Sequence, residues 1–282
     1  MAALTDLSDL INRQSGGNSG TPNNLFFHKV PRVGGAAATA TIAGRAASLW
    51  TYDGTPSGGA VPTAVAIPDR SLQGALPFTA ATGGRDLHLI GAMITPTVSG
   101  VFLLYDRLMH IGGLNGTLTT DQTVQGSPAS PAITRNTGGE GNIAWYEIYG
   151  IIGTTNRTLT MTYVNQAGTT GQTSTINIGA TGFREVTRAQ RIPLAAGDTG
   201  IRSIEKIALN GTTGTAGDFG ITLAQPLAWL PVGSVGTAGW RDYSTGLPGI
   251  PVIDPDACLA LMFIPTSTTA PELWGCLATI EK

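Results

Sequence analysis

The amino-acid sequence predicts a mainly β protein: an antiparallel β-sandwich or jelly-roll-like domain with an extended N-terminal arm that carries one short helix. Short apolar runs recur between turns rich in Gly, Pro and Thr, and the chain contains 39 Gly and 17 Pro. Apolar and polar residues alternate within several of these runs, which is the period of a half-buried strand. Helical spacing of apolar residues is clearest near the N-terminus, which places the helix there.

The first segment, 1–24, is predicted to form this helix and a flexible linker. Leu4, Leu7, Leu10 and Ile11 are spaced to form one apolar stripe. A stretch rich in Gly, Ser and Asn, "QSGGNSGTPNN", follows the stripe and is typical of a linker. Because so short a helix is marginal by itself, the stripe is expected to dock either on its own domain or on a neighbouring subunit.

Two further segments are predicted after the linker. Residues 25–77 are rich in Ala, Gly and Pro and show no sustained period, so they are assigned to an extended arm with a few short strands. Strand signals recur through 78–282, where turns separate them, and this favours an antiparallel sandwich over alternating βα units. No repeat of fixed period runs through the segment, which disfavours propellers, solenoids and parallel β-helices.

The stretch "TLTMTYVNQAGTTGQTSTINI", residues 158–178, shows the strand pattern most clearly. Leu159, Met161 and Tyr163 alternate with threonines, and a Gly-rich turn separates them from a return run of the same kind. One face of this predicted hairpin is apolar and the other carries hydroxyl groups. Such a sheet can meet water or another protein without desolvating a full charge.

The charge content limits the classes of partner. Only 12 % of residues are charged and the net charge is -2, so much of the surface is expected to meet protein. The chain has only three lysines, which argues against nucleic acid as a partner, because phosphate neutralisation needs clustered Lys and Arg. No apolar run approaches the roughly 18 residues of a membrane span, so no membrane partner is expected.

The two cysteines, Cys258 and Cys276, lie in apolar runs and are expected to be buried, reduced thiols. Nothing at the N-terminus resembles a secretion signal, which favours thiols over a disulfide. Synthesis and assembly in a cytoplasm are therefore expected.

Familiar catalytic motifs are absent from the sequence. It lacks the nucleophile elbow G-x-S-x-G, the phosphate loop G-x-x-x-x-G-K and the metalloprotease motif H-E-x-x-H. His28, His88 and His110 have no ligand-like spacing and stand beside apolar residues. The sequence therefore predicts no cofactor and no metal site.

Paired carboxylates offer the remaining route to catalysis. Asp254 and Asp256 are explained by a Pro-bent loop, and Glu140 and Glu147 by a strand with one outward-facing Glu. We therefore predict that the protein is not an enzyme and has no catalytic residues.

Aromatic residues near turns are candidates for binding a partner. Trp240, Arg241 and Tyr243 lie in "GWRDYSTG", where Gly and charged residues favour a surface position. Trp145 is expected to pack in the core instead. The predicted partner-binding residues are thus the helix stripe and these three residues.

Several longer strings carry a family resemblance: "LTDLSDLINRQSGGNSGTP", "GRAASLWTYDGTP", "LLYDRLMHIGGL", "TGFREVTRAQRIPLAAGDTGIRSI" and "GLPGIPVIDPDACLALMFIP". Together they resemble a group of tailed-bacteriophage virion structural proteins whose genes lie near those of the head. The resemblance covers most of the chain and carries no catalytic signature. It implies that the protein is part of a virion assembled in the host cytoplasm.

Within the virion, the resemblance leaves several roles open. A head decoration or cement protein is favoured, because such proteins commonly join an N-terminal arm to a compact β domain. Its partners would be the phage major capsid protein and copies of itself in a homo-oligomer. The alternative is a tail, baseplate or receptor-binding component with a glycan-binding β domain.

Overall fold

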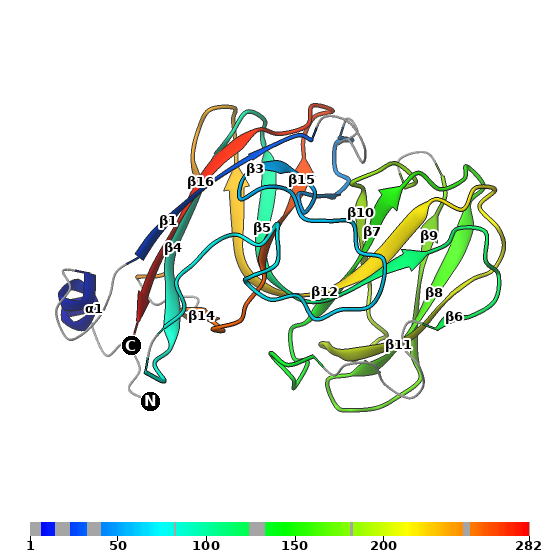
Figure 1. Ribbon diagram of the computed structural model, residues 1–282, viewed down its shortest axis with the longest axis horizontal. Coiled ribbons are helices and arrows are strands. Elements are labelled where there is room, and N and C mark those ends of the chain that lie inside the picture. Colours follow the sequence, from blue (N-terminus) through cyan, green and yellow to red (C-terminus); the bar gives the residue numbers. More distant parts are fainter. Residues whose placement is uncertain are drawn as a thin grey trace.

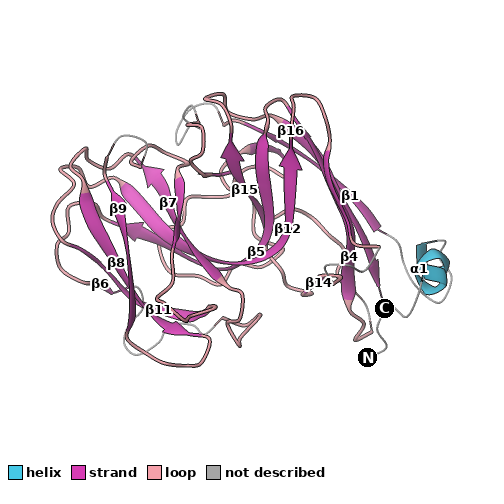
Figure 2. Ribbon diagram, turned by 180° about the vertical axis from the view of Figure 1, so that it is seen from behind, coloured by secondary structure: helices cyan, strands magenta, loops and turns pink. Residues whose placement is uncertain are grey.

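The computed structural model describes residues 7–14, 23–32, 41–81, 83–123, 133–180, 183–244 and 249–281. Three antiparallel sheets follow one another across the molecule, as Figures 1 and 2 show from opposite sides. The α-helix in this part of the chain is α1 (Leu7–Gln14). It lies beside the sheet that contains the C-terminal strand (Figure 1).

The terminal sheet, named for the strands near the two chain ends, has the order β13-β4-β16-β1-β3, and β14 pairs with β4. Its strands are β1 (Asn23–Val30), β3 (Asp53–Thr55), β4 (Leu87–Pro96), β13 (Gly239–Asp242), β14 (Val252–Ile253) and β16 (Leu273–Glu281).

The central sheet has the order β10-β7-β12-β5-β15-β2. Its strands are β2 (Ala47–Ser48), β5 (Gly100–Leu114), β7 (Ile143–Gly150), β10 (Ala189–Ile192), β12 (Asp218–Val232) and β15 (Leu259–Pro265). The hairpin sheet, with the order β6-β11-β8-β9, contains β6 (Gln122–Thr123), β8 (Arg157–Asn165), β9 (Gln172–Ile178) and β11 (Ile201–Leu209).

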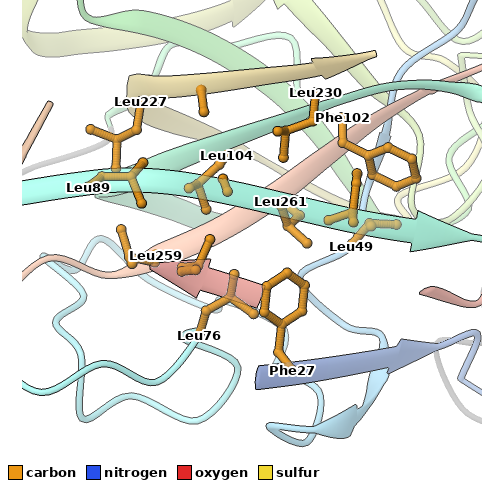
Figure 3. Close-up of a cluster of buried hydrophobic side chains, with 14 of the residues drawn as sticks. Phe27, Leu49, Leu76, Leu89, Phe102, Leu104, Leu227, Leu230, Leu259 and Leu261 are labelled. Atoms are coloured by element: carbon orange, nitrogen blue, oxygen red, sulfur yellow. The ribbon is translucent and has the colours of Figure 1, made fainter. Parts of the chain in front are cut away.

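The two largest hydrophobic cores among the described residues share the strands β5 and β12, each of which is 15 residues long. In the first core, Leu89 of the terminal sheet packs with Leu104 and Leu230 of the central sheet (Figure 3). In the second core, Met161 of the hairpin sheet packs with Ile221 of the central sheet. The two long strands therefore connect the terminal sheet to the hairpin sheet.

Asp106 lies on β5 between the two cores and is buried. Its carboxylate accepts hydrogen bonds from Arg135 Nε at 2.8 Å and from the backbone N–H of Cys258 at 2.8 Å. Arg135 Nη2 also donates to the carbonyl of Pro68 at 2.9 Å. One buried carboxylate thus ties together segments that are far apart in the sequence.

Arg107, the next residue on β5, is also buried and pairs with Glu147 of β7. Its Nη1 donates to Glu147 Oε1 at 3.0 Å, and both side chains are almost completely buried. A second donor, Nη2, reaches the hydroxyl of Tyr149 at 2.9 Å. Burial, the largest single influence, opposes the charge of Arg107, but Glu147 together with Tyr149, Tyr105 and Cys258 outweighs it, and the pKa of the guanidinium is raised well above its ordinary value.

The structure confirms the predicted hairpin. Leu159, Met161 and Tyr163 of β8 are fully buried, and Thr160 pairs with Thr175 of β9 in an antiparallel register. The prediction of a mainly β antiparallel fold is also confirmed, although the strands form three sheets and not the two of a simple sandwich.

The boundaries of the predicted arm are wrong. The short strands expected in residues 25–77 are present as most of β1 together with β2 and β3, but Phe27, Leu49 and Leu76 are buried in the first core (Figure 3). The segment crosses the sheets as irregular chain, so its buried residues follow no fixed period. The β domain therefore includes residues well before the predicted start at 78.

Of the two glutamates in the segment predicted to hold one outward-facing Glu, Glu140 is exposed, whereas the side chain of Glu147 is buried against Arg107. In a buried ion pair, each charge is stabilised by the opposite charge of its partner. We expect Glu147→Gln, which leaves Arg107 as a buried unpaired cation, to lower the free energy of unfolding by about 3–5 kcal/mol in urea denaturation.

The matched control is the exposed ion pair between Lys206 Nζ and Asp121 Oδ2, which are 2.8 Å apart. Asp121→Asn should cost less than about 1 kcal/mol, because water solvates both partners. Equal losses in the two variants would contradict the importance assigned to the buried pair.

Candidate interaction surface

The outer face of the terminal sheet carries a row of apolar side chains across four strands. The strand register places Phe26 of β1 opposite Cys276 of β16, Cys276 opposite Met93 of β4, and Met93 opposite Trp240 of β13. Directly paired residues point to the same face of a sheet. Phe26, Met93 and Trp240 are 72 %, 45 % and 65 % exposed. We call Phe26, Cys276, Met93 and Trp240 the apolar row.

Side chains alternate between the two faces along each strand, and the first core is formed by the inward-facing ones and not by the apolar row. Phe27, Ile94 and Leu277, which neighbour the row along the chain, point inward and are buried. The ring of Phe27 lies against Gly275, where an added Cβ would approach the ring to 2.0 Å. The inner face is therefore filled by its own residues, and the apolar row is an additional hydrophobic feature of the surface.

A groove of about 550 Å³ adjoins the row. The groove is hollow because two small residues, Gly91 and Ala278, pair with each other there. They lie next to the bulkier Met93 and Trp240. The groove has an almost entirely apolar lining. It is the kind of surface that an apolar helix stripe fits.

Helix α1 supplies two of the groove-lining residues, Leu7 and Ile11. These side chains remain 63 % and 57 % exposed, so the helix does not close the groove. The structure thus brings Leu7 and Ile11 of the predicted stripe to the same place as Trp240 and Arg241. Leu4, and the side chain of Leu10, lie outside the described residues.

Tyr243 is not part of this surface. It is buried, and its hydroxyl donates to the carbonyl of Leu227 at 2.6 Å. Burial, the largest influence, raises the pKa of the phenol. Arg241 lies over the Tyr243 ring at 5.4 Å, which leaves Trp240 as the exposed aromatic residue of this segment.

Polar and aromatic groups border the row on its other side. The rings of His28 and Trp274 are stacked with centroids 4.9 Å apart, and Trp274 is exposed. His28 Nε2 lies 3.0 Å from Glu272 Oε1. This polar margin beside an apolar centre resembles the composition of a protein interface.

Phe26, Met93 and Trp274 were not among the residues predicted from sequence. A signal existed in "LFFHKV", because two adjacent aromatic residues on a strand face opposite sides of the sheet, so one of them must leave the core. The register that aligns Phe26 with Met93 and Trp240 joins strands far apart in the chain. A local sequence pattern therefore does not predict that alignment.

The side chains considered for catalysis have structural partners. Glu147 is bound to Arg107, and Asp254 Oδ1 accepts a hydrogen bond from the backbone N–H of Asp256 at 2.9 Å within a local turn. Burial, and then the charge of Arg107, lower the pKa of His110 to about 3. Within the described ranges, no group of His, Cys, Asp and Glu side chains is arranged to hold a metal ion.

In the part of the chain that the structure describes, no helix has the length and apolar character needed to span a membrane.

No protein-family model and no curated protein sequence matches the chain. Among solved structures, it is similar to T=1 particles derived from infectious bursal disease virus, at 9 % identity and a TM-score of 0.19, over 93 % of this chain and 78 % of that chain. It is also similar to the VP2 subviral particle of that virus, at 8 % identity and a TM-score of 0.20, over 93 % and 80 % of the two chains. Functional inference therefore comes from the chain's own residues.

The two cysteines give a direct test of this surface. Both are free; Cys258 is fully buried, with its pKa raised by burial to about 12, whereas Cys276 is partly exposed in the apolar row. We expect a thiol reagent such as Ellman's reagent to modify one thiol per native chain and the second only in denaturant. Mass spectrometry should locate the first adduct at Cys276. Modification of Cys258 at a comparable rate would contradict the assigned faces.

Proposed function

We propose that this protein is a non-enzymatic structural component of a tailed-phage virion, and that it attaches to the capsid shell through the apolar row. The observation that carries the proposal is a continuous line of apolar side chains across four strands, none of which the core requires. The low charge content and the resemblance of the sequence to phage virion proteins support the same role. The favoured role is a decoration or cement protein that bridges major capsid protein subunits.

The size of the row indicates how strong one contact would be. Phe26, Met93 and Trp240 of the row, together with the bordering Trp274, expose roughly 400–500 Å² of side chain, on the scale of 150–250 Å² per large aromatic residue. At about 25 cal/mol per Å², burying this area gives about 10–12 kcal/mol gross. Association costs about 4–15 kcal/mol, so this row alone would give weak attachment for each copy.

Additional contact area is available from helix α1. Leu7 and Ile11 already line the groove beside the row and remain largely exposed, so a partner can bury the helix and the row together. A helix laid into an apolar groove is a common mode of recognition. Repetition over a shell, or pairing into an oligomer, would raise the strength of attachment through effective concentration.

The first test adds purified protein to virus particles that lack it and measures occupancy by quantitative gel. Trp240→Ala should reduce occupancy about tenfold or more, because large aromatic side chains at the centre of an interface dominate its energy. Trp229→Ala is the matched control, since it removes an exposed indole from the central sheet. The proposed surface would be wrong if Trp240→Ala bound as well as wild type, or if both variants lost binding equally.

The second test concerns α1. Deletion of residues 1–20 should lower both the occupancy and the heat resistance that the bound protein gives to particles. Gly91→Val should have a similar effect with the helix still present, because it fills the groove. The added Cβ meets only ordinary contacts at 3.7 Å, so this variant should fold normally. Full occupancy by both variants would mean that α1 has no part in attachment.

Copy number per virion separates the shell role from the alternative tail or baseplate role. Hundreds of copies per particle support decoration of the head, whereas a few tens at most place the protein in the tail. Release of reducing sugar from host polysaccharide, abolished by Asp254→Asn, would overturn the non-enzymatic part of the proposal.

A further inference from the structure

A second groove lies on the central sheet, apart from the apolar row. Its volume is about 600 Å³, within the range of about 300–1,000 Å³ typical of small-molecule sites. Trp145 of β7 and Trp229 of β12 line it, and Trp229 is exposed. The groove therefore offers a flat aromatic surface on which a ring can stack.

Two arginines also line this groove. Arg191 of β10 pairs with Trp145 across the sheet, so its side chain lies on the same face as that indole. The Arg45 guanidinium lies 3.6 Å from the centroid of the Phe183 ring. Stacking occupies one face of a guanidinium and leaves its N–H groups at the edge able to bind a carboxylate. No Asp or Glu is among the described lining residues, so the charge of the lining favours an anion.

The wall that carries Arg45 is held in place by backbone hydrogen bonds. Ala189 N–H donates to the carbonyl of Ala46 at 2.9 Å, and Gly44 N–H donates to the carbonyl of Pro265 at 2.8 Å. These bonds attach the wall to the central sheet on two sides. A groove fixed in this way loses little entropy when a ligand binds.

Trp145 provides a further indication that the groove binds a polar ligand. Its indole N–H is buried and has no hydrogen-bond acceptor among the described residues. Buried donors nearly always have a partner. Because Trp145 lines the groove, the groove wall contains a buried donor without a partner among the described residues.

We propose that this groove binds an acidic sugar residue, with the sugar ring stacked on Trp229 and its carboxylate held by Arg191 and Arg45. Aromatic rings and guanidinium groups also suit single-stranded nucleic acid. The chain has 16 Lys and Arg against 18 Asp and Glu, so it lacks the basic field that a polyphosphate requires. A single carboxylate needs only the two arginines, which favours the saccharide.

The test titrates the full-length protein with methyl glucuronide and with methyl glucoside, its neutral counterpart, by saturation-transfer NMR and tryptophan fluorescence. We expect saturable binding of the glucuronide and binding of the glucoside at least about tenfold weaker. Trp229→Ala and Arg191→Gln should each weaken glucuronide binding about tenfold or more. Trp240→Ala, on the terminal sheet, should leave it unchanged.

Three results would overturn the proposal: no saturable binding of the glucuronide, equal affinity for the glucoside, or equal loss in Trp240→Ala. Binding of a thymidine oligonucleotide that depends on Trp229, without glucuronide binding, would assign the groove to nucleic acid instead. The outcome is independent of attachment to particles, because the two surfaces lie on different sheets and are changed by different substitutions.

Discussion

The fold depends on two adjacent buried charges in the middle of β5. Asp106 is held by Arg135 and the backbone of Cys258, while Arg107 is held by Glu147 and Tyr149. Removing two charges from water is costly, and only partners with good geometry offset that cost. Because the partners come from segments remote in sequence, the charges are satisfied only when both cores and the connecting chain have assembled around the central sheet.

The residues that stabilise the fold differ from those that the outer face of the terminal sheet exposes. The long strands β5 and β12 serve both cores, and the inner face of the terminal sheet is filled by residues such as Phe27 and Leu277. The outer face of that sheet is then free to carry Met93 and Trp240 without weakening the core. Exposed apolar side chains in such a line favour association, and the proposed attachment to a capsid shell depends on this tendency.

Local patterns predicted part of the fold. Alternation identified the hairpin of β8 and β9, because one face of each strand is buried. Alternation also predicts that Trp240 and Tyr243 do not share a face. They are three positions apart, so in a continuous strand their side chains point to opposite faces of the sheet. The burial of Glu147 was not predictable in this way, because its partner Arg107 is brought beside it only by pairing of the central strands. The apolar row likewise depends on long-range register.

Side-chain footprinting by hydroxyl radicals, read by mass spectrometry, tests the central claim most directly. Oxidation rates are compared between the free protein and the protein bound to virus particles. If the outer face of the terminal sheet is the attachment surface, Met93 and Trp240 should be oxidised several-fold more slowly on the particle, while Trp229 of the central sheet keeps its free rate. Unchanged oxidation of Met93 and Trp240 on fully occupied particles would contradict the account.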